Sequence, residues 1–293
     1  MEIFQLTGFA DEAAVNLPEQ IKAMKSCGLH FVELRQVDGI NIGSFSEEKA
    51  RSVAGALTDA GIGVSCLGSP VGKTVLDTPF EPVAEMTRRL CENAHILQTR
   101  YIRIFSFYLP NGQTAAECRG EVIDRLGRLL DIAEKQDITL LHENERDIYG
   151  DTRERCLDLH QALGTRLRGI LDPANYLLVG TDPLAAMHDL EPWIDYIHIK
   201  DVRLADNRIV PAGAGDGQIP EILRIMSRKP GQHFLSVEPH LTLFAGRDKF
   251  EKNTGAVIPT ASDEFVFPDG PSAFAAAVSA TKTLVDAWKK EGI

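Results

Sequence analysis

Long hydrophobic runs, paired cysteines and an excess of basic residues are all missing from this chain of 293 residues. No apolar stretch reaches the length that spans a bilayer, and the first residues lack the basic region that opens a secretory signal. The five cysteines include no C-x-x-C pair, and an odd number cannot form a closed set of disulfides, so reduced thiols are expected. We therefore expect a cytoplasmic protein that does not enter a membrane.

The charge balance disfavours nucleic acid as a partner. Lys and Arg number 31 against 42 Asp and Glu, which gives a formal net charge of -11 at pH 7. Such a chain repels phosphate backbones and anionic lipid surfaces as a whole. We expect a small-molecule partner, no nucleic acid and no membrane contact, and leave open whether the chain forms a homo-oligomer.

The hydrophobic pattern alternates between short β-branched or aromatic runs and longer stretches of helical period, which is typical of a parallel sheet covered by helices. Eight units of this kind occur in order. The expected strands are residues 3–8, 31–34, 63–67, 101–105, 138–142, 169–171, 196–199 and 234–237. No Pro/Ser-rich linker divides the chain, so we expect one domain over residues 1–293.

Eight regularly spaced units favour an α/β fold with a single closed (β/α)8 TIM barrel, a fold that commonly reaches this length. An open doubly wound sheet is the alternative, but no G-x-G-x-x-G follows the first expected strand. One long stretch, residues 240–272, lies between the last strand and the last helix. Its basic residues Arg247, Lys249 and Lys252 fit a cover over an anionic substrate, a dimer contact or a solvated surface.

Polar side chains stand at the ends of the last four expected strands, where the reactive groups of such a barrel project. They are Glu143, Asp172, His198 and Glu238. Each residue alone is explained by an ion pair or a satisfied interior histidine, but neighbouring strands of a closed barrel point these four at a common centre. Three converging carboxylates without a cation would raise one another's pKa, so a divalent metal ion is expected. This ligand set suits Mn2+ or Mg2+, with Co2+ or Zn2+ as alternatives.

Five short motifs accompany these residues in order along nearly the whole chain. They are Glu143-Asn144-Glu145, Leu171-Asp172-Pro173-Ala174-Asn175, His198-Ile199-Lys200-Asp201, Gly213-Ala214-Gly215-Asp216-Gly217 and Val237-Glu238-Pro239. Together they resemble the xylose isomerase-like TIM-barrel family of sugar phosphate isomerases and epimerases. The resemblance implies that Glu143, Asp172, His198 and Glu238 bind one divalent cation, and that Glu143 and Glu238 also act as acid and base. It further implies that Arg203 contacts substrate oxygens.

One position departs from that family. Many members carry a histidine three residues after the aspartate, where this chain has Asn175. Asparagine can donate a hydrogen bond to a substrate hydroxyl, but it neither titrates near neutral pH nor replaces histidine as a strong metal ligand. The departure also argues that this chain is not one of the related DNA-repair endonucleases. Lys73, Glu145 and His240 are further candidates for substrate contacts, with Lys73 suited to an anionic group.

Other polar residues near the strand ends have two interpretations. Glu33, Arg35 and Arg103 could bind substrate, but ion pairs between neighbouring strand ends explain them equally well. The glycine loop that begins at Gly213 is expected to form a structured turn, with Asp216 capping the next helix.

The site predicts a metal-dependent isomerase or epimerase of a sugar, keto-sugar or sugar phosphate, in which a glutamate removes a proton next to a carbonyl and an enediolate forms. Return of the proton to the other face of the same carbon is epimerisation, and return to the neighbouring carbon is isomerisation. A metal-dependent lyase, such as a dehydratase of a cyclic keto acid or inosose, would begin with the same proton abstraction. A non-catalytic sugar-binding barrel is the third interpretation.

Overall fold

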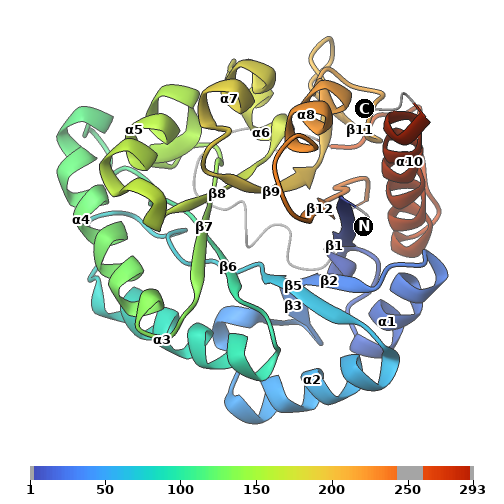
Figure 1. The fold of residues 1–293 in the computed structure, drawn as a ribbon, viewed down its shortest axis with the longest axis horizontal. Coiled ribbons are helices and arrows are strands. Elements are labelled where there is room, and N and C mark those ends of the chain that lie inside the picture. Colours follow the sequence, from blue (N-terminus) through green and yellow to red (C-terminus); the bar gives the residue numbers. More distant parts are fainter. Residues whose placement is uncertain (1–2, 243–259, 291–293) are drawn as a thin grey trace.

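The computed structural model describes residues 3–242 and 260–290, so Arg247, Lys249 and Lys252 lie outside the described residues. Eight parallel strands form a ring in the hydrogen-bonded order β1-β12-β9-β8-β7-β6-β5-β2, and the two end strands contact each other (Figure 1). The strands are β1 (Phe4–Gly8), β2 (Phe31–Leu34), β5 (Gly63–Leu67), β6 (Tyr101–Ile104), β7 (Thr139–Glu143), β8 (Arg168–Leu171), β9 (Ile194–Ile199) and β12 (His233–Val237). The predicted TIM barrel is confirmed.

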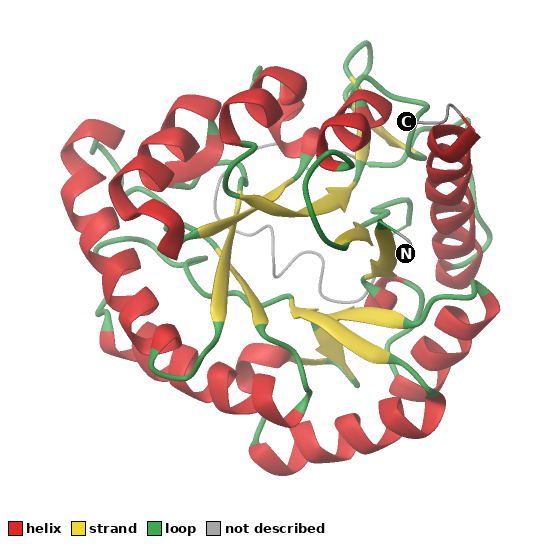
Figure 2. Cartoon of the chain, viewed as in Figure 1, coloured by secondary structure: helices red, strands yellow, loops and turns green. Residues whose placement is uncertain are grey.

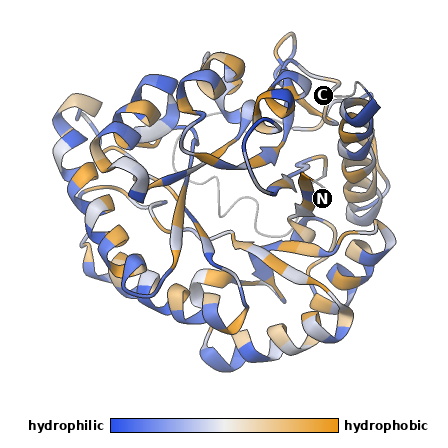
Figure 3. Ribbon diagram, in the orientation of Figure 1, coloured by the Kyte–Doolittle hydropathy of each residue, from blue (hydrophilic) through white to orange (hydrophobic). Residues whose placement is uncertain are grey.

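Helices surround this ring of strands (Figure 2). They are α1 (Leu17–Ser26), α2 (Glu47–Ala60), α3 (Glu81–Ile96), α4 (Ala115–Glu134), α5 (Arg153–Leu163), α6 (Pro173–Leu178), α7 (Pro183–Leu190), α8 (Ile219–Met226) and α10 (Gly270–Lys290). Hydrophobic and hydrophilic residues share each long helix (Figure 3). In α4 the buried stripe is Val122, Leu126, Leu129 and Ala133, all 0% exposed, and their spacing of three and four places them on one face.

Local signals set the ends of the helices. In α2, the Ser46 hydroxyl accepts a hydrogen bond from the Lys49 backbone N–H, and Gly61 ends the helix at a positive φ of 71°. In α4, Thr114 and Glu117 form a reciprocal capping box. These caps fix where each helix begins relative to the preceding strand.

Two small antiparallel ribbons were not predicted. β3 (Gln36–Val37) pairs with β4 (Ile40–Asn41), and β10 (Asp201–Arg203) pairs with β11 (Arg208–Val210). Strands of two or three residues are too short to show a period of two, so the pattern carries no signal for them. Both ribbons follow barrel strands, β2 and β9, and extend the loops at the carboxyl ends of those strands.

The last helix closes the barrel wall against the first strand. The α10 residue Trp288 packs edge-on against Phe4 of β1, with 5.0 Å between ring centroids. Phe274 and Val278 of the same helix are also buried. None of the described helices has the length and apolarity that a membrane crossing requires.

The interior of the barrel is polar beneath the carboxyl ends of its strands. Thr7 Oγ1 lies 2.8 Å from Ser65 Oγ, and Ser65 Oγ lies 3.0 Å from the Tyr196 hydroxyl. All three residues are 2% exposed or less. Tyr196 and His198 are two residues apart on β9, so both side chains point into the barrel. The hydrogen-bonded layer therefore supports the histidine from below.

Candidate metal centre

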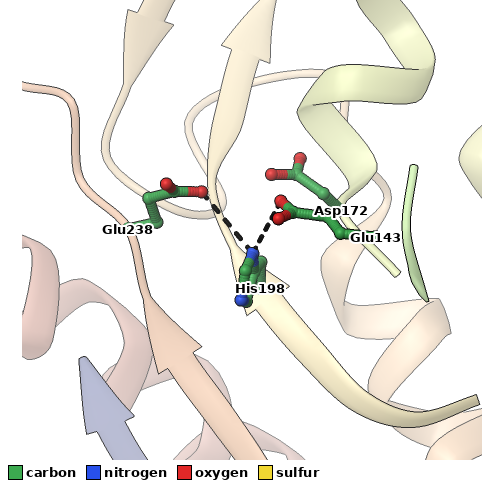
Figure 4. A group of neighbouring side chains, drawn as sticks. All are labelled: Glu143, Asp172, His198 and Glu238. Atoms are coloured by element: carbon green, nitrogen blue, oxygen red, sulfur yellow. Dashed lines mark hydrogen bonds and ion pairs between the residues drawn. The ribbon is translucent and has the colours of Figure 1, made fainter. Parts of the chain in front are cut away.

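The four side chains expected to bind a metal ion come together at the carboxyl end of the barrel. Glu143 ends β7, Asp172 follows β8, His198 lies on β9, and Glu238 follows β12. One ligand atom from each lies within 4.8 Å of the others, and none of the four residues is more than 4% exposed. Figure 4 shows Glu143 and Glu238 approaching His198 from opposite sides.

His198 links two of the carboxylates through one nitrogen. Its Nδ1 lies 2.8 Å from Glu143 Oε1 and 3.5 Å from Glu238 Oε2. Phe9 and Tyr196 contact the imidazole edge-on, with centroid distances of 5.3 and 5.9 Å. These two rings hold the plane of the imidazole, so Nδ1 faces the carboxylates.

Asp172 is fixed by the helix that it starts. Its Oδ1 accepts a hydrogen bond from the Asn175 backbone N–H at 2.9 Å, which makes it the N-cap of α6, and Pro173 occupies the first helical position. The Asn144 side chain bonds to the Asp172 backbone at both N–H and carbonyl, each at 2.9 Å. These contacts leave Oδ2 directed at the cluster.

Three buried cations balance the acids. Arg103 Nη1 lies 3.1 Å from Glu143 Oε2. Lys200 Nζ lies 2.7 Å from Asp172 Oδ2 and 3.3 Å from Glu238 Oε2. Arg35 Nη1 lies 3.1 Å from Glu238 Oε1, and the same guanidinium also pairs with two carboxylates in the turn that follows β1. Sequence reasoning assigned no function to Lys200, although it lies in a quoted motif.

Burial and neighbouring charges shift the pKa values of Asp172 and Glu238 in opposite directions. Burial raises the pKa of Asp172 to about 7, and the nearby glutamates add to this while Lys200 opposes it. Burial would also raise the pKa of Glu238, but Lys200, His240, His198 and Arg35 outweigh burial and hold that pKa well below its usual range. The Asp172 carboxylate therefore ionises less readily than a free aspartate unless a further positive charge lies close to it.

The donor set fits a divalent cation. Glu143 Oε2 and Asp172 Oδ2 are buried and accept no well-aligned hydrogen bond, although Arg103 and Lys200 lie close to them. Carboxylate oxygens with one imidazole nitrogen suit Mn2+, Mg2+, Co2+ or Zn2+. Glu143, Asp172, His198 and Glu238 are the residues that would hold the ion.

A second group of ligand-type atoms shares Glu238. It contains Glu12, Glu238 and His240, whose atoms also lie within 4.8 Å of one another. Arg35 already lies 3.1 Å from both Glu12 Oε1 and Glu238 Oε1, so a guanidinium supplies the positive charge there. Burial nevertheless raises the pKa of Glu12 to about 8. Glu12 also accepts a hydrogen bond from the His240 backbone N–H at 2.7 Å, so this group links Glu238 to His240.

Most residues expected to contact substrate border the cluster. Lys73 Nζ pairs with Glu145 Oε2 at 3.0 Å and lies over the Phe105 ring. His240 Nε2 lies 3.5 Å from Glu238 Oε1. The Asn175 amide donates to the Asn144 carbonyl at 3.0 Å, so this asparagine buttresses the cluster.

Arg203 pairs with two acids that are not part of the four-residue cluster. Its guanidinium pairs with Asp206 at 2.7 Å and Glu264 at 2.6 Å, and its side chain is 31% exposed. Substrate contact by Arg203 stays a prediction.

The glycine loop wraps a buried aspartate. The backbone N–H groups of Gly213, Gly215 and Gly217 donate to the Asp201 carboxylate at 2.8 to 3.1 Å. The expected turn is present, but the expected cap is wrong. Gln218 precedes α8 without a side-chain cap, and Asp216 instead accepts a hydrogen bond from the Leu204 backbone N–H.

Comparison with known proteins finds a curated relative and solved structures of the same fold. A curated 3-dehydroshikimate dehydratase from Bacillus anthracis is 25% identical over 154 residues, which cover 50% of this chain and 55% of that protein. The chain thus spans about half the length of this relative. The solved IOLI protein, which has a bound zinc atom, is 15% identical with a TM-score of 0.74, covering 97% of this chain and 99% of that one. The D-allulose 3-epimerase from Methylomonas sp. is 14% identical with a TM-score of 0.72, covering 97% and 99%.

At these identities the solved structures show a shared fold. The family model described as xylose isomerase-like TIM barrel matches residues 21–255, which is most of the chain and includes all four clustered side chains. The protein therefore belongs to the xylose isomerase-like TIM-barrel family.

Proposed function

We propose that this protein is a divalent-metal-dependent isomerase or epimerase of a small keto-sugar or related sugar. The observation that carries the proposal is the convergence of Glu143, Asp172, His198 and Glu238 within 4.8 Å, buried at the carboxyl end of the barrel. Similarity to a D-allulose 3-epimerase supports the sugar class of substrate. The similar fold of a zinc-containing barrel supports the metal.

The metal would make a carbon-bound proton removable. A proton next to a ketone is far less acidic than a carboxylic acid, so an ordinary carboxylate cannot remove it without help. A divalent ion held by the four side chains would supply Lewis-acid stabilisation of developing negative charge, worth several kcal/mol.

The two glutamates handle the proton. Glu143 and Glu238 approach from opposite sides of the centre (Figure 4), so one carboxylate can take the proton and the other can return one. Arg103 lies beside Glu143, and Lys200 and Arg35 lie beside Glu238, so each buried glutamate has a cation within 3.3 Å. Substrate held between them would lie within reach of either carboxylate.

The test is proton exchange with solvent. Purified protein with Mn2+ is incubated in deuterated buffer with a panel of ketoses, inososes, keto acids and their phosphates, and proton NMR follows loss of a carbon-bound proton. We expect exchange with one substrate class, and a loss of at least about 10²-fold in Glu143→Gln and in Glu238→Gln. Normal exchange in either variant would refute the assignment of that glutamate.

A dehydratase is the second candidate, because the curated relative is a 3-dehydroshikimate dehydratase. It would use the same first proton abstraction and then expel hydroxide from the neighbouring carbon. Exchange accompanied by net loss of water identifies this reaction. Ligand binding without any exchange would instead indicate a sugar-binding protein.

A further inference from the structure

Glu33 is a buried carboxylate that the proposed reaction does not use. It lies on β2, on the opposite side of His198 from the clustered acids, and is 0% exposed. Its Oε2 lies 3.1 Å from His198 Nε2. The same imidazole places Nδ1 2.8 Å from Glu143 Oε1. His198 is therefore held between two carboxylates, one at each ring nitrogen.

Only one of the two nitrogens faces the other expected ligands. Nδ1 lies near Glu143 and Glu238, at 2.8 and 3.5 Å, whereas Nε2 points to Glu33. A neutral imidazole binds a metal ion through the nitrogen that lacks a proton, and the other nitrogen then carries the proton. For this centre, Nδ1 must be the bare nitrogen and Nε2 must carry the hydrogen.

Packing alone does not select that tautomer. Phe9 and Tyr196 contact the ring edge-on and limit its rotation, but these contacts are the same whichever nitrogen is protonated. A hydrogen-bond acceptor at Nε2 does distinguish the two forms, because it stabilises only the one with a proton there. Glu33 is an acceptor at the required distance.

We propose that Glu33 is a positioning residue for the metal centre, whose carboxylate accepts the Nε2–H of His198 and so leaves Nδ1 free to bind the ion. The proposal rests on the metal centre described under the proposed function. A buried, ionised side chain is costly unless it is paired, and the hydrogen bond to His198 supplies that pairing. Loss of Glu33 should weaken metal binding without removing any of the four ligands.

The experiment measures metal affinity in the absence of substrate. Chelator-treated protein is titrated with Zn2+ in competition with a fluorescent chelator. Glu33→Ala should weaken binding by roughly 10- to 100-fold, and Glu33→Gln, whose amide oxygen can still accept the hydrogen bond, by less. Asp195→Asn is the control, because Asp195 is an acid near the start of β9, at the other end of the strand from His198, and pairs with Arg168 at 2.6 Å. It should bind Zn2+ as the wild type does.

A second measurement does not depend on how well the variants fold. Long-range 1H–15N NMR of wild-type protein loaded with Zn2+ should show His198 protonated at Nε2 and metal-bound at Nδ1. The opposite tautomer, or a Glu33→Ala affinity within about twofold of wild type, overturns the proposal. Wild-type protein that binds no Zn2+ contradicts the metal centre itself, which separates the two failures.

Discussion

The two halves of the barrel mouth carry different kinds of residue. On β7, β8, β9 and β12 and just beyond them lie the four clustered side chains, Glu143, Asp172, His198 and Glu238. On β2 and β6 and just beyond them lie the residues that contact these four, namely Glu33, Arg35 and Arg103. One half supplies the four clustered side chains, and the other supplies side chains that pair with three of them.

The difference follows from the cost of burying charge. Acids gathered away from water raise one another's pKa, and a cation brought close reverses this. Arg35 and Arg103 lie close to the clustered acids from the half of the mouth formed by β2 and β6, and Lys200, just after β9, does so from the ligand half itself. The supporting half thus supplies two of the three cations beside the ligand half.

Removal of Arg35 should have the largest effect on stability. Its guanidinium pairs with Asp11, Glu12 and Glu238, and it is 4% exposed. Arg35→Met leaves buried carboxylates without their cation, so we expect a loss of about 3–5 kcal/mol in the free energy of unfolding, measured by denaturant titration. The exposed Arg51→Met control should lose less than about 1 kcal/mol. Equal stability of Arg35→Met and wild type would contradict the supporting function of this half.

The effect of Mn2+ on the free energy of unfolding tests whether the four clustered side chains bind a metal ion. If Mn2+ binds only the folded protein, a concentration 100 times its dissociation constant should raise the free energy of unfolding by about 2.7 kcal/mol, and chelation should reverse the gain. Asp172→Asn should lose most of that gain at the same Mn2+ concentration, as followed by thermal or denaturant unfolding. A gain that is unchanged in this variant would place the ion elsewhere.

The outer face of β7 contrasts with its inner face. His142 points away from Glu143 toward the helices, lies 3.0 Å from Ser106 Oγ, and contacts the His160 ring. Burial, with a contribution from His160, lowers the pKa of His142 to about 3 from its ordinary 6.5. The stability supplied by the neutral buried ring is therefore fully present above pH 6.5 and is lost as the pH falls toward 3.

For His142 alone we expect a loss of roughly 1 kcal/mol between pH 6.5 and 5.5. Denaturant unfolding of chelator-treated wild type and His142→Gln at both pH values measures it as a difference. A variant that loses as much stability as the wild type over this range would show that other groups cause the acid sensitivity.

Arg203 should give the smallest effect on stability. It is partly exposed and pairs with Asp206 and Glu264. Arg203→Ala should therefore unfold like the wild type. If the residue also contacts substrate oxygens, as the family resemblance implies, KM should rise several-fold while kcat changes little. Unchanged KM would remove Arg203 from the substrate site.

Much of the fold could be predicted because the barrel strands are long enough to show a pattern. All eight were expected, and β2 and β5 agree at both ends, whereas β7 is Thr139–Glu143 rather than residues 138–142. The boundary moved because the ladder with β8 continues to Glu143. Hydrogen bonds between strands that are far apart in the sequence decide where each strand ends, and the sequence alone does not show these bonds.

The ligand half of the site was predictable, and the supporting half was not. An acid or histidine at the end of each neighbouring strand has few interpretations, so Glu143, Asp172, His198 and Glu238 could be named together. Glu33, Arg35 and Arg103 were noticed only as candidates for substrate or ion pairs, because the partner of a buried charge is set by contacts across the barrel. Lys200 lies between Asp172 and Glu238, a position that its spacing in the sequence does not show.

An anomalous difference map from crystals grown with Mn2+ would locate the bound ion. We expect one strong peak per chain, surrounded by Glu143, Asp172, Glu238 and the Nδ1 of His198. A peak between Glu12 and His240 instead, or no peak at the four-residue cluster, would contradict the assignment of these four ligands.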